Sequence, residues 1–252
     1  MRELIKQFCR VAEETLDLKP PIVEVGSFQV SGQEGFADLR PFFSGKKYIG
    51  CDMRPGNGVD RVENLPRLSF PDGSLPTIIC LDTLEHVYEI RESISDFYRV
   101  LTDDGILIIS SVFNFPIHGH PCDFWRFTPQ CFARLLEKFS CSFVGVQGSD
   151  SNPHTVYGIG FKGRAVSEMR PWLNVFEHAF KAAVTDNLKS DVAAYIPKKL
   201  ARRAVLTRGA RYPYYLWKRA RYARDQKRFY CLKMRLLGRG DAEKEESGIF
   251  GC

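Results

Sequence analysis

The sequence predicts an α/β protein with a doubly wound, mostly parallel seven-stranded sheet and a basic helical C-terminal extension. Short apolar runs alternate with segments of helical periodicity as far as about residue 161, which is typical of a parallel sheet covered by helices. The first two predicted strands each end in an acidic residue, and a glycine turn follows the first. Residues 196–240 contain 15 Lys and Arg but a single acid, Asp225, so the C-terminal region differs sharply from the rest.

The composition excludes several classes of protein. A chain of 252 residues with 44% hydrophobic content is long enough for a sizeable core, so disorder of the whole chain is not expected. The first 16 residues carry charges throughout, and no apolar stretch reaches the roughly 18 to 20 residues that span a bilayer. We therefore expect a soluble, cytoplasmic protein.

The eight cysteines are scattered, with no C-x-x-C pair and no His/Cys cluster at zinc spacing. Several lie inside predicted strands, where a thiol packs as a small apolar group. Free thiols are the expected state, and no metal site is expected.

The first half of the chain predicts three strands and two helices. Residues 1–18 form an amphipathic helix that stops at Pro20 and Pro21, and residues 22–25 form a short buried strand. Beyond the glycine turn, Phe36, Leu39 and Phe43 recur at helical spacing. Residues 48–51 form the second strand and residues 59–62 the third, separated by a glycine- and proline-rich loop at 55–58.

The second half predicts four more strands. They are residues 77–81, 106–110, 142–146 and 156–161. A helix between the first two has its apolar residues at Val87, Ile90, Ile94, Phe97 and Leu101. Thr128 and Pro129 suit the N-cap and first position of another helix. The strand signal stops near residues 162–171, so we expect one domain over residues 1–165 and the basic helical extension over 166–252.

Six fragments in order carry a family resemblance. They are IVEVGSFQVSG, YIGCDMR, FPDGS, LDTLEHV, RVLTDDGILIIS and HGHPCDFWRFTP. Over about residues 20–163 they resemble the class I S-adenosylmethionine (SAM)-dependent methyltransferases, especially the type 11 group and its bacterial members tied to glycan modification. The resemblance implies a Rossmann-like methyltransferase fold, SAM as cofactor, and methyl transfer to an oxygen or nitrogen of a small-molecule or glycan acceptor.

Physical reasoning and the resemblance assign the same donor site. A glycine turn lets backbone N–H groups approach a ligand, and a strand-end carboxylate can accept both hydrogens of a ribose diol. The resemblance places Glu24 near the amino end of the cofactor, the loop of Gly26, Ser27 and Gly32 at its carboxylate, Asp52 at the ribose and Met53 against adenine. The alternative for Glu24 and Asp52 is that they merely end strands.

Three further positions belong to the predicted donor site or depart from the family pattern there. Asn64 stands where similar proteins usually have an acid that contacts the adenine amino group, and its alternative is a polar loop residue. Phe28 replaces a glycine common in the family, which predicts a wider loop or a ring that covers the cofactor. Asp82, just after a predicted strand, is expected to face the cofactor.

The acceptor side is predicted to lie after the fourth and fifth strands. The candidate catalytic residues there are His86, His118, His120, Asp123 and Arg126. Our hypothesis is that a histidine acts as general base and that Arg126 orients a polar or anionic acceptor. The alternatives are a capping role for His86, loop packing for His118 and His120, and a mutual ion pair between Asp123 and Arg126.

The extension predicts a basic amphipathic helix. Its apolar positions are Leu216, Ala220, Ala223, Tyr230, Met234 and Leu237, with Lys218, Arg221, Arg228 and Arg235 opposite. Such a helix suits an anionic membrane surface, so peripheral contact with the inner membrane face is expected. The alternatives are RNA binding and a helix docked on the body. The competing overall function is a non-catalytic binding protein that engages a membrane or nucleic acid through this tail, and the oligomeric state is left open.

Overall fold

The computed structural model describes residues 3–32, 34–119, 122–149, 151–195 and 232–238. Its strands are β1 (Ile22–Val25), β2 (Tyr48–Asp52), β3 (Arg61–Val62), β4 (Leu75–Leu81), β5 (Leu101–Val112), β6 (Cys141–Ser149), β7 (Asn152–Phe161) and β8 (Leu232–Gly238). Its helices are α1 (Glu3–Thr15), α2 (Ile90–Val100), α3 (Pro129–Leu135) and α4 (Val166–Tyr195), with short 3₁₀ turns η1 (Arg40–Phe43) and η2 (Leu84–His86).

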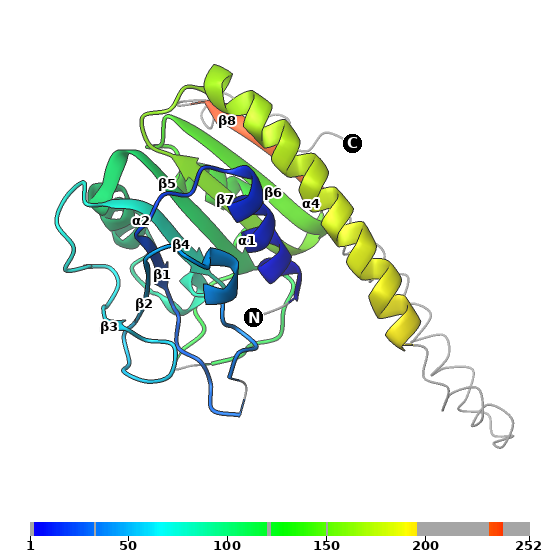
Figure 1. The fold of residues 1–252 in the computed structure, drawn as a ribbon, viewed down its shortest axis with the longest axis horizontal. Helices are drawn as coiled ribbons and strands as arrows, with labels where there is room; N and C mark the ends of the chain where they lie inside the picture. Colours follow the sequence, from blue (N-terminus) through cyan, green and yellow to red (C-terminus); the bar gives the residue numbers. More distant parts are fainter. Residues whose placement is uncertain (1–2, 33, 120–121, 150, 196–231, 239–252) are drawn as a thin grey trace, which may run out of the picture.

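The eight strands form one sheet in the order β3-β2-β1-β4-β5-β7-β6-β8 (Figure 1). The pairs from β3 to β5 are all parallel, and β7 runs antiparallel between β5 and β6. The chain winds from β1 toward one edge and then returns to β4 on the other side of β1. The doubly wound, mostly parallel sheet is confirmed, and it places a topological switch point between β1 and β4.

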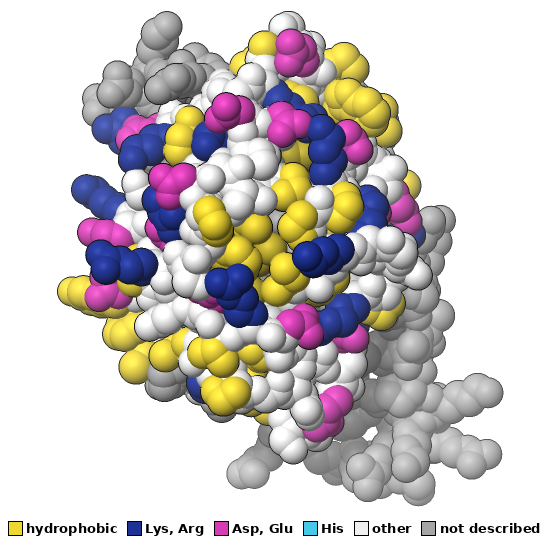
Figure 2. Space-filling model, turned by 60° about the vertical axis from the view of Figure 1, so that its left-hand side comes forward, with side chains coloured by type: hydrophobic (Ala, Val, Ile, Leu, Met, Phe, Trp, Pro, Cys, Tyr) yellow, Lys and Arg dark blue, Asp and Glu magenta, His cyan; other side chains and the backbone are white. Residues whose placement is uncertain are grey.

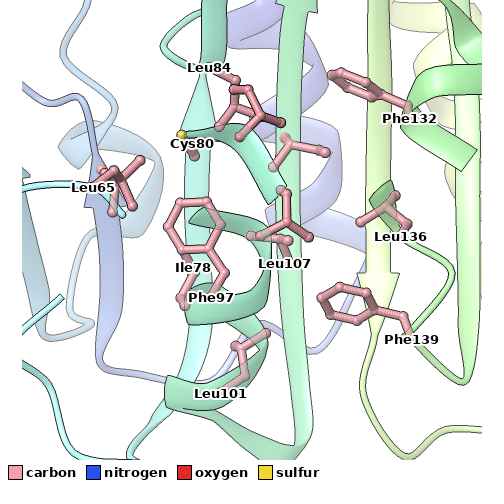
Figure 3. Close-up of a cluster of buried hydrophobic side chains, with 14 of the residues drawn as sticks. Leu65, Ile78, Cys80, Leu84, Phe97, Leu101, Leu107, Phe132, Leu136 and Phe139 are labelled. Atoms are coloured by element: carbon pink, nitrogen blue, oxygen red, sulfur yellow. The ribbon is translucent and has the colours of Figure 1, made fainter. Parts of the chain in front are cut away.

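Helices cover both faces of the sheet. Along β1 the side chains alternate, so Ile22 joins the core beneath α1 and α4 whereas Val23 joins the core beneath α2 and α3. Figure 1 shows α1 and α4 in front of the sheet. Figure 3 shows the opposite core, where Phe97 of α2 and Phe132 of α3 lie with strand residues Ile78 and Leu107.

An aromatic cluster fixes α1 and the first half of α4 to the sheet. The Phe8 ring of α1 lies 4.5 Å from that of Tyr157 and 5.4 Å from that of Phe180, between ring centroids. Phe176 also packs on Phe8 and is fully buried. The first half of α4 therefore belongs to the core of the body. The division at residue 165 stays a prediction, but the chain after it begins as part of the same packed unit.

Two predicted helices differ in the structure. Between β1 and β2 there is no α-helix, and only the 3₁₀ turn η1 stands where Phe36, Leu39 and Phe43 predicted one. Positive-φ glycines on both sides, among them Gly35 and Gly45, and a proline inside η1 interrupt helical geometry here. The helix predicted from Val87 to Leu101 spans only Ile90–Val100, because η2 precedes it and Leu101 begins β5.

The predicted C-terminal helix is wrong over residues 232–238. Met234 and Leu237 lie in β8, which pairs antiparallel with β6. This pairing gives the backbone groups of β6 partners that an edge strand would lack, which is the physical reason to expect a strand here. The other residues of the predicted helix lie outside the described part of the chain. Among the described helices, none combines the length and apolarity needed to cross a bilayer.

The surface of the body mixes charges of both signs. Figure 2 shows one face on which Lys and Arg side chains alternate with Asp and Glu around a patch of hydrophobic side chains. Such a surface produces no strong field of one sign on that face. The basic character of the sequence is concentrated after residue 195 instead.

Candidate active site

A cleft of about 550 Å³ opens where four parallel strands end. Its lining includes Val25 and Gly26 after β1, Asp52 at the end of β2, Thr83 after β4, and Val112 at the end of β5. The cleft therefore lies at the switch point between β1 and β4, where open α/β sheets bind their ligands. A second groove of about 630 Å³, between α2 and α3, includes Arg91 and Arg134 but no strand residue.

The glycine turn after β1 is held by the neighbouring strand. Gly26 has φ +92° and lines the cleft, and the N–H groups of Gly26 and Ser27 both donate to the Cys51 carbonyl. The N–H of Gly32 donates to Glu34 Oε1. These three N–H groups thus have protein partners in this structure instead of facing the cleft. Ser27 is buried behind the turn and does not line the cleft.

Thr83 is a neighbour of this turn that sequence reasoning missed. Its hydroxyl donates to the Leu81 carbonyl, and its side chain packs against the Cα of Gly26 so closely that a Cβ there would lie 2.0 Å from Thr83 Oγ1. Thr83 follows Asp82 in the fragment LDTLEHV, but nothing in the sequence links it to residue 26. The contact exists because β1 and β4 are neighbours in the sheet.

Glu24 lies away from the cleft. Its carboxylate points to the α1 face, is 3% exposed and accepts a 2.6 Å hydrogen bond from the Tyr48 hydroxyl. Burial raises the pKa of Glu24 to about 7, against the opposing effect of the Tyr48 hydrogen bond. Direct contact with the amino end of a cofactor therefore has no support from this geometry, and Glu24 is a buried group that ionises near neutral pH.

Replacing Glu24 by Gln should change how stability depends on pH. A carboxyl whose pKa is raised on folding, from 4.5 to about 7, contributes stability below pH 4.5 that is lost as the pH rises through 7. We expect wild type to lose about 3 kcal/mol from this group over that range, and the Glu24→Gln variant to lack this component. Urea denaturation at pH 4.5 to 8 measures it.

The exposed Glu14 of α1 offers the control, because Glu14→Gln should leave the pH profile as it is. Above pH 7 the Glu24→Gln variant should be the more stable protein. Parallel pH profiles for Glu24→Gln and wild type would contradict the raised pKa.

One wall of the cleft is formed by residues that the sequence predicts to contact the cofactor. Asp52, Met53, Asn64 and Asp82 all line it. Asp52 Oδ1 accepts from the backbone N–H of Arg54 at 3.0 Å, and Met53 is half exposed. Asp82 has φ +48° and accepts from Ser110 Oγ. Their contacts with a cofactor stay predictions, and the structure brings the four to one cavity.

Phe28 occupies the place of the expected second glycine. It lines the cleft, and the Arg54 guanidinium lies over its ring, 4.4 Å from the ring centroid. The ring therefore forms part of the wall, next to Asp52. This fits the interpretation that Phe28 covers a bound ligand.

The opposite wall brings together Glu85, His86 and His118. The rings of the two histidines lie 4.9 Å apart, and His118 Nε2 is 3.9 Å from Glu85 Oε1. His86 Nδ1 is 2.5 Å from the Cys122 carbonyl, and burial lowers the pKa of His86. Glu85 is fully buried and accepts a 2.6 Å hydrogen bond from Ser111 Oγ. Glu85 is not among the residues predicted from the sequence, although it precedes His86 in LDTLEHV.

Asp123 and Arg126 pair with each other, as the structural alternative predicted. Arg126 donates to both oxygens of Asp123 and to the carbonyls of Phe115, Pro116 and Trp125, so its five N–H groups are all used. The guanidinium holds the pKa of the Asp123 carboxyl well below its usual range. In this arrangement Arg126 has no donor left to orient an acceptor, which corrects that expectation. His120 lies outside the described residues.

A comparison with family models covers part of the cleft. A family model described as a methyltransferase domain matches residues 39–109, from η1 to β5. Over these residues the chain is similar to SAM-dependent methyltransferases. The match supports SAM as the cofactor, and the matched segment contains Asp52, Asn64, Asp82 and His86 of the cleft.

Several solved structures, methyltransferases among them, are similar to this chain at low sequence identity. A SAM-dependent methyltransferase from Archaeoglobus fulgidus is 15% identical, with a TM-score of 0.47 over 64% of this chain and 95% of that chain. The YcgJ protein from Bacillus subtilis is 13% identical, with a TM-score of 0.46 over 63% and 99%. A SAM-dependent methyltransferase from Mesorhizobium loti is 12% identical, with a TM-score of 0.45 over 62% and 98%. Curated protein sequences give no match.

Proposed function

We propose that the methyltransferase domain transfers a methyl group from SAM to an oxygen or nitrogen of a small-molecule or glycan acceptor. The observation that carries this proposal is the arrangement of the cleft. Asp52 and Gly26 lie on one wall at the ends of β1 and β2, and Glu85, His86 and His118 lie on the wall formed after β4 and β5. A donor on the first wall would present its methyl group to an acceptor near the second.

The chemistry asks mainly for alignment. The acceptor atom attacks the methyl carbon in line with the carbon–sulfur bond, so holding both molecules in one cavity supplies much of the rate enhancement. An acceptor hydroxyl must also lose its proton. The titratable groups beside the path are His86 and His118, together with the buried Glu85.

An aromatic surface beside the histidines supports a ring-shaped acceptor. Tyr88, Phe124 and Trp125 are exposed, and the Tyr88 ring lies 5.5 Å from Phe124 and 5.9 Å from Trp125, between centroids. Trp125 Nε1 donates to the carbonyl of Val87, a residue of the cleft wall, which fixes the indole. Rigid aromatic faces with one polar edge suit the flat apolar face of a sugar or an aromatic small molecule.

Contact with an anionic membrane and a cytoplasmic location stay expectations that rest on sequence. The basic residues concerned lie mainly between 196 and 231, outside the described part of the chain. Liposome sedimentation of the full chain, with and without anionic lipid, addresses the membrane expectation separately from methyl transfer.

The donor half of the proposal is tested by calorimetric titration with SAM. We expect one site per chain in the micromolar range, and we expect Asp52→Ala to weaken binding by about 30-fold because two charge-assisted hydrogen bonds are lost. Asp17→Ala, an exposed acid next to α1, should leave the affinity as it is. Absence of SAM binding by wild type would refute the methyltransferase proposal.

The acceptor half needs a methyl-release assay at saturating SAM. Nucleotide sugars, free oligosaccharides, aromatic small molecules and amines form the panel. Turnover with a sugar or small-molecule hydroxyl or amine supports the proposal. Turnover confined to proteins or nucleic acids would overturn the acceptor class and leave SAM binding intact.

A further inference from the structure

Three side chains on the acceptor wall have the composition of a metal site. Among the described residues, Glu85, His86 and His118 form a group that could hold a metal ion, with one ligand atom from each and all three atoms within 4.8 Å of one another. Two imidazoles and one carboxylate are a ligand set used for divalent first-row transition metals. All three residues line the cleft, so a bound ion would face its interior.

The His86 ring is oriented as a metal ligand. Its Nδ1 is 2.5 Å from the Cys122 carbonyl, and a carbonyl only accepts hydrogen bonds. Nδ1 therefore carries the proton, and the neutral ring keeps its lone pair on Nε2. Metal-binding histidines usually donate their second N–H to a carbonyl or carboxylate in this way.

The His118 ring repeats the arrangement with different partners. Its Nδ1 lies 3.2 Å from Asp123 Oδ2 and 3.2 Å from the Pro116 carbonyl, both of them acceptors. Its backbone N–H donates to the same Asp123 oxygen at 2.7 Å, which fixes the residue twice. The other ring nitrogen, Nε2, lies 3.9 Å from Glu85 Oε1 and is the His118 atom placed to meet a ligand.

Hydrogen bonds also hold Glu85 in position. Glu85 Oε2 accepts from Ser111 Oγ at 2.6 Å, and Ser111 is fully buried in β5. The Glu85 carbonyl accepts from the N–H groups of Phe124 and Trp125, so the loop that carries Asp123 is tied to the same residue. Each of the three side chains is thus held by a partner on its far side.

We propose that Glu85, His86 and His118 bind a divalent first-row transition metal ion in the cleft. Bonds of about 2.1 Å place neighbouring ligand atoms about 3 Å apart, so the three atoms, which lie within 4.8 Å of one another, would draw closer on binding. Three protein ligands leave coordination positions open toward the cleft, which is the pattern of catalytic rather than structural sites.

The catalytic consequence rests on the proposed methyl transfer. An acceptor hydroxyl that coordinates the ion at an open position loses its proton to solvent more readily. Its oxygen then attacks the methyl carbon, the carbon–sulfur bond breaks, and the electron pair stays on sulfur to give a neutral thioether. The two histidines would act as ligands in this scheme, and no separate general base would be needed.

Metal binding is tested directly, without turnover, on tag-free full-length protein. Mn²⁺ is titrated while the electron paramagnetic resonance signal of the free ion is followed, because Mn²⁺ prefers nitrogen and oxygen ligands to the eight cysteine thiols of this chain. We expect one Mn²⁺ per chain. His86→Ala, His118→Ala and Glu85→Gln should each weaken binding at least about 30-fold. His178→Ala, at an exposed position of α4, should bind like wild type.

Co²⁺ absorption of the wild-type protein provides a second measurement that depends on no variant. Ligand-field bands without a thiolate charge-transfer band support a nitrogen and oxygen site. Absence of stoichiometric Mn²⁺ binding, or binding that survives both histidine substitutions in folded variants, overturns the metal site. SAM binding by the same samples distinguishes the two proposals, since a chain that binds SAM but no metal loses only this one.

Discussion

Replacement of Gly26 by Ala is expected to lower the affinity for SAM by about 100-fold or more. A Cβ at this position would lie 2.0 Å from Thr83 Oγ1 and 2.8 Å from its Cγ2, and the backbone has φ +92°, which L-residues with side chains avoid. The turn would have to move away from β4, and with it the wall of the cleft. A shift of about 2.7 kcal/mol corresponds to this loss, measured by calorimetric titration with SAM.

Two companion variants separate the clash from backbone strain. Gly73 has a positive φ as well, but a Cβ there meets nothing within 4 Å, so Gly73→Ala should cost only about 1 kcal/mol of stability and leave SAM affinity intact. Adding Thr83→Ala to Gly26→Ala removes the hydroxyl and methyl that clash and should restore part of the affinity. Unchanged SAM binding by Gly26→Ala would show that the turn does not shape the donor site.

Much of this fold could be read from local pattern. The strands β1, β2, β4 and β5 are short apolar runs between turn signals, and their alternation with helices implies the parallel order. The two wrong helix predictions have different causes. The segment around Phe36 has apolar residues at helical spacing, but glycines and a proline override that spacing. At 232–238 the partner strand β6 decides the structure, and a sequence pattern does not show that partner.

The candidate site, too, could be predicted from the sequence only in part. Asp52 and Asp82 end or follow strands, so sheet topology alone brings them to one edge. Burial and side-chain partners could not be read from spacing. Glu24 also stands near a strand end, but the alternation along β1 turns it under α1, toward Tyr48. His86 and His118 meet because Asp123 and the Cys122 carbonyl hold their rings, and those contacts arise only in the folded loop.

Replacement of Arg126 by Ala is expected to destabilise the protein by about 3 kcal/mol and to disorder the acceptor wall. The Asp123 carboxylate, 2% exposed, would lose the cation that bonds both of its oxygens. Three backbone carbonyls of the same loop would lose a donor. Urea denaturation measures the first effect. Turnover and Mn²⁺ binding should fall together, because Asp123 orients His118, while SAM affinity should change less than about threefold.

The controls for this variant separate charge from geometry. Arg126→Lys keeps the positive charge but not the planar fork, so it should recover only part of the stability. Arg134 of α3 and Glu137 form an exposed ion pair at 3.2 Å, and Arg134→Ala should change stability by less than about 0.5 kcal/mol. If Arg126→Ala weakened SAM binding as strongly as turnover, the loop would support the donor site as well, and the separation of the two walls would fail.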